Sequence, residues 1–282
     1  MNIYPSYKCN ISCSFCGIHK LKGKTIDLNW IYEQLLEHPI LRSNINILGG
    51  EPSILPERYQ EDLINICIEL SGEKPYYITN LYKISPFLRK CKPIISYDFN
   101  LREYNCLNNI LTLDFPFAIS TILTSYLVND VGYLKYLKFI NSLKLCYRAD
   151  LDIYYKSKNC SIDYTPDNDK LLEFISKIMD HPKVNLAPYS AMKNNIDSSF
   201  MNISDYFALL PDNLYGVRMD YSNGPYAKFK TFEEAIEFFN NRIQNKLCNN
   251  CEFIKTCWYP CSDNICRGNK DMLTLFKRNL NG

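Results

Sequence analysis

The residues best suited to metal chemistry are three cysteines close to the N-terminus, Cys9, Cys13 and Cys16. Their spacing is C-x3-C-x2-C, and the polar residues between them favour a loop. Three thiolates on one short loop can bind three irons of a [4Fe–4S] cubane and leave the fourth iron open. A catalytic metal needs such an open position. The alternative is a zinc site, in which His19 could supply a fourth ligand.

A second group of five cysteines lies near the C-terminus, in the spacing C-x2-C-x5-C-x3-C-x4-C. Its members are Cys248, Cys251, Cys257, Cys261 and Cys266. Ligation by thiolates alone favours an iron–sulfur cluster or zinc. Five cysteines exceed the four that a zinc site needs, and the sequence has no histidine nearby. The segment therefore predicts a second metal centre, with zinc as the alternative.

Composition limits the remaining classes of function. The chain has 282 residues, of which 13 are cysteines, and its formal net charge is +2. This charge does not indicate a broad nucleic-acid-binding surface. No apolar run approaches the ~18 residues of a membrane span, and the N-terminus lacks the apolar stretch of a signal peptide. We expect a cytoplasmic protein without a membrane or nucleic-acid partner, in which clustered cysteines are metal ligands rather than disulfides.

Hydrophobic periodicity predicts that strands and helices alternate through the first 190 residues. The predicted strands are 3–7, 45–48, 76–79, 94–97, 117–123 and 145–154, and 184–186 is a further short candidate. The predicted helices are 27–37, 56–70, 133–140 and 171–178. This alternation is typical of a parallel sheet with helices outside it. About six strands are fewer than the eight of a full barrel. The expected fold is therefore α/β, a partial (β/α)6 parallel barrel with a small cysteine-rich C-terminal extension.

The domain boundaries follow from a change in composition. Residues 1–190 form the expected barrel, in which side chains at the C-terminal strand ends would meet. Residues 191–247 are rich in polar residues and predict a linker or an irregular substrate-facing segment. Within them, Thr231–Glu234 has the pattern of a capping box that opens a helix. Residues 248–282 form the expected cysteine-rich extension.

A second motif, Gly49-Gly50-Glu51-Pro52, follows a predicted strand. Its glycines allow the backbone to approach a ligand closely, and its carboxylate can accept hydrogen bonds from an amine. Together with the three cysteines, it resembles the signature of the radical SAM superfamily. That resemblance implies an open iron that binds the amino and carboxylate groups of S-adenosylmethionine (SAM). Reductive cleavage would then give methionine and a 5′-deoxyadenosyl radical, which abstracts a substrate hydrogen.

The resemblance also implies roles for residues at the predicted strand ends. Gly49, Gly50 and Glu51 would contact the amino group of SAM. Polar residues of the later strands would also bind SAM, namely Asn80, Ser96, Ser120 and Arg148. In the family, a serine and an arginine from this region serve the ribose and the carboxylate of SAM. Arg102 is the alternative to Arg148 for the carboxylate.

The C-terminal cysteines resemble the SPASM or twitch extension of radical SAM enzymes. The resemblance implies one auxiliary [4Fe–4S] cluster, bound by Cys248, Cys251, Cys257 and either Cys261 or Cys266. Cys266 is favoured, because the residue that matches Cys261 serves another cluster in two-cluster relatives. The upstream half of that motif is absent between residues 190 and 247.

Three functions remain open. The favoured one is modification of a ribosomally made peptide or protein by crosslinking, oxidation or epimerisation. The alternatives are a small-molecule dehydrogenase or epimerase, and a non-catalytic zinc-binding module. The enzyme would need a reducing partner such as flavodoxin or ferredoxin. Because Cys9 is so close to Met1, we expect no leader-binding domain before the barrel. A separate leader-peptide-binding protein, or residues 191–247, would then bind a peptide substrate. Spare thiols that could return a hydrogen atom to it are Cys91, Cys106 and Cys160.

Overall fold

One sheet organises the molecule. The computed structural model describes residues 1–154, 162–194, 206–218, 226–243, 252 and 270–281. In this part of the chain the strand order is β10-β9-β8-β1-β2-β3-β4-β5-β6-β7. The strands are β1 (Asn2–Ile3), β2 (Asn46–Ile47), β3 (Tyr76–Thr79), β4 (Lys92–Ser96), β5 (Phe117–Leu123), β6 (Cys146–Ile153), β7 (Val184–Asn185), β8 (Phe207–Leu210), β9 (Leu214–Arg218) and β10 (Tyr226–Phe229). Neighbouring strands from β1 to β7 pair in parallel.

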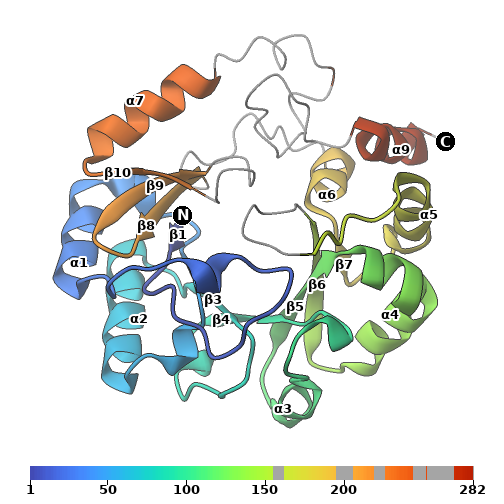
Figure 1. The fold of residues 1–282 in the computed structure, drawn as a ribbon, viewed down its shortest axis with the longest axis horizontal. Coiled ribbons are helices and arrows are strands. Elements are labelled where there is room, and N and C mark those ends of the chain that lie inside the picture. The colour runs from blue at the N-terminus through green and yellow to red at the C-terminus, as the bar shows by residue number, and fades with distance from the viewer. Residues whose placement is uncertain (155–161, 195–205, 219–225, 244–251, 253–269, 282) are drawn as a thin grey trace.

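The sheet curls into an open wall with helices along its outer side (Figure 1). The helices are α1 (Leu28–Glu37), α2 (Glu57–Ser71), α3 (Leu107–Thr112), α4 (Gly132–Ser142), α5 (Asn168–Ile178), α6 (Ala187–Lys193), α7 (Phe232–Ile243) and α9 (Lys270–Asn281). Short helical turns join them, namely η1 (Ile18–Lys20), η2 (Pro39–Arg42), η3 (Pro52–Ile54), η4 (Leu88–Lys90), η5 (Phe99–Leu101) and η6 (Tyr126–Val131). The predicted partial parallel barrel is confirmed.

Local sequence signals explain where the outer helices begin and end. The Asp27 side chain accepts hydrogen bonds from the backbone N–H groups of Asn29 and Trp30, at 2.7 and 3.3 Å, and so caps α1. Asp167 caps α5 in the same way. Gly72 ends α2 with a φ of 73°, a conformation that glycine adopts without a steric penalty. These caps explain why the predicted helix boundaries lie close to the observed ones.

Side-chain alternation separates the helix-facing core from the inner face of the barrel. On β6, Ala149 and Leu151 are buried in the main hydrophobic core. Arg148, Asp150 and Asp152 alternate with them and share the opposite face. Asp152 lies at the C-terminal end of the strand and lines a cavity. This face of β6 is therefore polar, and it carries side chains that could meet a ligand.

The structure differs from the expectation of an irregular segment between residues 191 and 247. Strand β8 pairs in parallel with β1, and β9 and β10 continue the sheet in antiparallel pairing. Asp212 and Asn213 turn the chain between β8 and β9 with φ angles of 67° and 55°. Strand β8 is a fully buried four-residue run, so it lacks the apolar–polar alternation that would reveal it.

The helix that follows these strands begins where the capping box predicts. The Thr231 N–H donates to Glu234 Oε2, and the Glu234 N–H donates to Thr231 Oγ1, both at 3.3 Å. This reciprocal pair satisfies N–H groups that the first turn of α7 cannot use internally.

Helix α9 anchors the C-terminal end of the chain to α5 and α6. Its side chains Met272, Leu273 and Phe276 are buried in the main core. Asn279 donates to Asp180 Oδ2 at 3.1 Å. The five C-terminal cysteines lie outside the described residues, as do their predicted metal roles. Among the described helices, none is long and apolar enough to cross a membrane.

Candidate functional site

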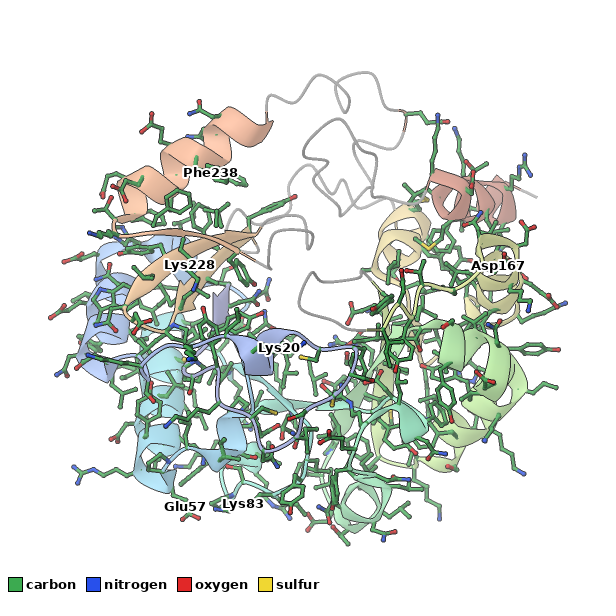
Figure 2. The ribbon with its side chains drawn as sticks, viewed as in Figure 1. Lys20, Glu57, Lys83, Asp167, Lys228 and Phe238 are labelled. Carbon is green, nitrogen blue, oxygen red and sulfur yellow. The ribbon has the colours of Figure 1, made fainter. Side chains whose placement is uncertain are left out.

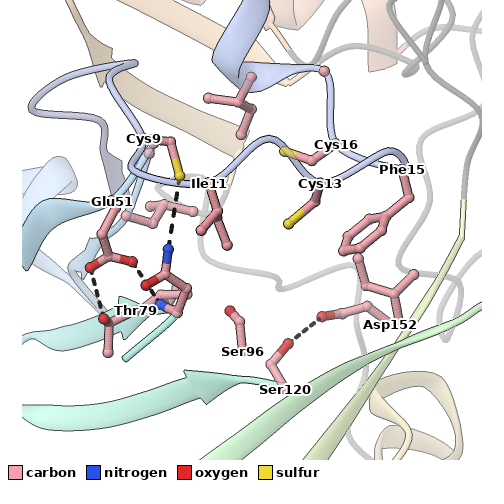
Figure 3. Close-up of a pocket in the computed structure, with 18 of the residues that line it drawn as sticks. Cys9, Ile11, Cys13, Phe15, Cys16, Glu51, Thr79, Ser96, Ser120 and Asp152 are labelled. Atoms are coloured by element: carbon pink, nitrogen blue, oxygen red, sulfur yellow. Dashed lines mark hydrogen bonds between the residues drawn. The ribbon is translucent and has the colours of Figure 1, made fainter. Parts of the chain in front are cut away.

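A cavity of about 430 Å³ lies where the N-terminal loop meets the C-terminal ends of β3 to β6 (Figure 3). Cys9, Cys13 and Cys16 all line it. The structure therefore brings the three cysteines to the strand ends, where a parallel barrel places its chemistry.

Contacts from distant parts of the chain fix the loop that carries these cysteines. The Ser12 N–H donates to Glu103 Oε2 at 2.8 Å, and the hydroxyls of Ser14 and Tyr164 are 2.7 Å apart. The Cys16 N–H donates to the Cys13 carbonyl oxygen at 3.0 Å, which closes a tight turn. The loop is therefore held in one shape by the protein itself.

The glycines of the GGEP turn allow the backbone of the turn to lie close to the backbone of the cysteine loop. The Gly50 N–H donates to the Ser6 carbonyl at 3.0 Å, and the Glu51 N–H donates to the Lys8 carbonyl at 2.8 Å. A Cβ on Gly50 would lie 1.9 Å from the Lys8 carbonyl oxygen. Gly49 has a φ of 139°, which other residues rarely adopt. The motif thus serves the packing of two loops, in addition to any contact with a ligand.

Glu51 links the turn to the end of β3. The residue is 2% exposed. Its carboxylate accepts hydrogen bonds from the Ser53 N–H at 3.0 Å, the Thr79 hydroxyl at 2.7 Å and the Asn80 N–H at 2.7 Å. A carboxylate has about four acceptor positions. Contacts with described residues use three of them, which leaves one for an amine in the cavity.

We expect Glu51→Gln to destabilise the protein by about 1–3 kcal/mol, because an amide nitrogen cannot accept the hydrogen bonds that one carboxylate oxygen now accepts. Urea unfolding measures this change. Glu57→Gln is the matched control. Glu57 is an exposed residue on the outside of the molecule, and its carboxylate is 3.4 Å from the Lys83 amine (Figure 2). Equal effects of the two substitutions would contradict the role of Glu51.

The next predicted residue, Asn80, reaches the cysteine loop directly. Its Nδ2 lies 3.0 Å from Asn10 Oδ1 and 3.8 Å from Cys9 Sγ. Its Oδ1 accepts from the Tyr82 N–H at 2.9 Å, which fixes the amide orientation. Asn80 therefore orients the first cysteine and lines the cavity.

The two predicted serines lie side by side on neighbouring strands. Ser96 on β4 is in register with Ser120 on β5, and both line the cavity. The Ser120 hydroxyl donates to Asp152 Oδ2 at 3.2 Å. Asp152 is a cavity residue that was not among the predicted site residues. Its position at the end of a predicted strand, two residues after Asp150, was the available signal.

Arg148, which was expected to bind SAM, lies outside this cavity. Arg148 is the third residue of β6, near its N-terminal end, whereas the cavity lies at the C-terminal ends. Its Nε is 2.9 Å from Asp150 Oδ1, and its guanidinium is 5.8 Å from the ring centres of Tyr76 and Tyr147. Arg102, the alternative, lines the cavity.

The chemistry of the donors fits an iron–sulfur cluster. Burial raises the pKa of the Cys13 thiol to about 11, and Arg102 opposes the shift; burial also raises the pKa of Cys9. Binding of a cluster would therefore displace protons from these thiols and would become easier as the pH rises. Among the described residues, no three Cys, His, Asp or Glu side chains converge as ligands of one ion. A cubane does not require this, because each thiolate binds a different iron.

The other described cysteines lie away from this cavity. Cys67, Cys91, Cys106 and Cys146 are buried free thiols, and none of them lines it. Cys91 lines a smaller cavity beside the N-terminal end of β4. The positions of Cys91 and Cys106 therefore do not support the idea that either thiol returns a hydrogen atom to a substrate in this cavity. The third candidate, Cys160, lies outside the described residues.

Comparison with solved structures identifies the fold. The chain matches Streptococcus suis SuiB bound to S-adenosylmethionine with a TM-score of 0.64 and 16% identity, over 92% of this chain and 72% of SuiB. It matches anSMEcpe with bound AdoMet and Kp18Cys peptide with a TM-score of 0.69 and 16% identity, over 99% of this chain and 97% of that protein.

The FeFe-hydrogenase maturase HydG from Carboxydothermus hydrogenoformans matches with a TM-score of 0.52 and 13% identity, over 85% of this chain and 65% of HydG. No protein-family profile and no curated protein sequence matches. All three structures are radical SAM enzymes. The chain therefore has the radical SAM fold, as its motifs predict.

Proposed function

We propose that this protein is a radical SAM enzyme that modifies a peptide or protein. The observation that carries the proposal is that Cys9, Cys13 and Cys16 line one cavity together with the GGEP turn and the ends of four parallel strands. When bound there, a [4Fe–4S] cluster supplies the electron that cleaves SAM into methionine and a 5′-deoxyadenosyl radical.

Different residues around the cavity would bind the cluster and SAM. The three cysteines would hold the cluster, and Asn80 orients Cys9. The acceptor position left on Glu51 would bind the amino group of SAM, and Arg102 would bind its carboxylate. Three of the five N–H donors of Arg102 are used in contacts with described residues, which leaves two for that carboxylate.

Apolar and hydroxyl side chains complete the SAM site in this proposal. Phe15, Ile122 and Tyr154 line the cavity and exclude water from its inner wall. Ser96 and Ser120 offer hydroxyls to a ribose. Enclosing the site in this way protects a reactive radical from solvent.

Two structural neighbours support a peptide or protein as the substrate. SuiB has been crystallised with the precursor peptide SuiA, and anSMEcpe with the Kp18Cys peptide. The proposal includes a reducing partner such as flavodoxin or ferredoxin and a separate leader-peptide-binding protein. It places the enzyme in the cytoplasm, where thiols stay reduced.

Formation of 5′-deoxyadenosine tests this function. The protein is reconstituted with iron and sulfide under anaerobic conditions, reduced with dithionite and incubated with SAM. Chromatography with mass spectrometry should detect 5′-deoxyadenosine and methionine in equal amounts. Fully cluster-loaded protein that leaves SAM intact would contradict the proposal.

The auxiliary cluster gives a separate prediction. We expect Cys251→Ala to retain SAM cleavage but to lose modified product, because Cys251 belongs to the second cysteine group and an auxiliary cluster would accept an electron from the substrate radical. The measurement compares the yields of 5′-deoxyadenosine and modified peptide in one reaction. Normal product from the variant would argue against an auxiliary redox role.

A further inference from the structure

Arg102 is the charged group that touches the cysteine loop from inside the protein. Its side chain is 13% exposed, and its Nη1 lies 3.9 Å from Cys13 Sγ. Its guanidinium also lies 5.2 Å from the centre of the Phe15 ring. Two residues of the loop therefore pack against one fixed cation.

A buried carboxylate holds that cation in place. Asp98 is 4% exposed, and its Oδ2 is 2.6 Å from Arg102 Nη2 and 2.7 Å from Arg102 Nε. The other oxygen of Asp98 accepts from the Ile122 N–H at 2.8 Å, which ties the pair to β5. Because both partners are fixed, the guanidinium cannot turn away from Cys13 without leaving a buried charge unpaired.

No other basic side chain lines the cavity within the described residues. The carboxylates that line it are Glu51 and Asp152. Reduction adds a negative charge to an iron–sulfur cluster, and nearby charges and hydrogen bonds to its sulfurs set its potential. Arg102 favours the reduced form, whereas the carboxylates oppose it.

We infer that the Arg102–Asp98 pair sets the reduction potential of the cluster that Cys9, Cys13 and Cys16 bind. This inference rests on the proposed function. Arg102 stabilises the reduced cluster through Cys13, and Asp98 limits the effect by partly neutralising the guanidinium. The electron itself comes from the low-potential donor protein, and the pair decides how readily the cluster accepts it. Arg102 and Asp98 act here as positioning residues.

A redox titration without SAM tests this role. Reconstituted wild-type protein, Arg102→Met, Arg102→Lys and Asp98→Asn are titrated with dithionite and mediators. The N-terminal cluster is followed by EPR through the signal that is absent from Cys13→Ala, which separates it from an auxiliary cluster. We expect Arg102→Met to reduce the equilibrium constant for reduction about tenfold, which is about 59 mV for one electron. Arg102→Lys should lower the equilibrium constant for reduction by less, because lysine keeps the positive charge. Asp98→Asn should shift the potential in the opposite direction, because it removes a negative charge.

Reduction potentials that shift in opposite directions in Arg102→Met and Asp98→Asn indicate electrostatic tuning. General structural damage would not give shifts of opposite sign. Equal potentials in all four proteins, or shifts of the same sign in Arg102→Met and Asp98→Asn, would overturn the inference and leave the proposed function standing. If Arg102→Met does not retain the cluster, Arg102→Lys and Asp98→Asn decide the sign. Wild-type protein that binds no cluster would overturn both claims.

Discussion

Replacing Cys13 with alanine abolishes the reductive cleavage of SAM in our account. Cys13 is 3% exposed, lines the cavity, contacts Arg102 and accepts the Cys16 N–H through its carbonyl, so its sulfur is fixed at the centre of the loop. The two remaining thiolates would leave two irons without a protein ligand. We expect 5′-deoxyadenosine formation to fall at least about a thousandfold, to the background of protein without a cluster.

The matched control is Cys91→Ala. Cys91 is also a buried free cysteine, but it precedes β4 at the opposite end of that strand from the cavity. Its loss should cost stability through a small internal void and leave SAM cleavage intact. Undiminished 5′-deoxyadenosine formation by Cys13→Ala would refute the assignment, whatever the control shows.

Gly50→Ala is expected to have the second-largest effect. The new methyl group would lie 1.9 Å from the Lys8 carbonyl oxygen and 2.6 Å from that of Tyr7, so the backbone of the cysteine loop must move. We expect a loss of about 3 kcal/mol in the free energy of unfolding, because both clashing groups are backbone atoms that cannot rotate away. The displaced loop should also bind iron poorly. Urea unfolding and iron analysis measure the two effects.

Gly72→Ala separates this clash from the general cost of replacing glycine. Gly72 has a φ of 73° at the end of α2, and a Cβ there would meet no atom within 4 Å. Its replacement should cost about 1–2 kcal/mol in backbone strain and leave iron binding unchanged. If Gly50→Ala behaves like Gly72→Ala, the close approach of the two loops is not required.

The sequence predicts the elements whose signals are local. The predicted strands 76–79 and 117–123 match β3 and β5, and the predicted helix after Asp27 matches α1. Each signal is a run of apolar residues or a capping side chain that lies within one segment. Strands β8 to β10 could not be predicted in this way. Strand β8 is a short apolar run that periodicity alone does not distinguish from a buried helix segment, and β9 and β10 extend the sheet from β8 in antiparallel pairing.

In the candidate site, too, local motifs were predictable from the sequence, whereas contacts between distant residues were not. The cysteines and the GGEP turn are recognisable as motifs, because their spacing is local. The choice between Arg148 and Arg102 depends on the fold, because Arg148 lies near the N-terminal end of β6 whereas Arg102 follows η5 in the connection after the C-terminal end of β4. Asp98 and Arg102 are four residues apart, so this pair was visible in the sequence, but its contact with Cys13 depends on the fold.

The EPR spectrum of the reduced protein, recorded with and without SAM, tests the central claim most directly. An open iron in the cluster of the N-terminal cysteines would bind SAM and change the electronic structure of that cluster. We predict a [4Fe–4S] signal whose g values shift when SAM is added, and which Cys13→Ala eliminates. A colourless protein that contains stoichiometric zinc, or cluster signals of which SAM changes none, would contradict the account.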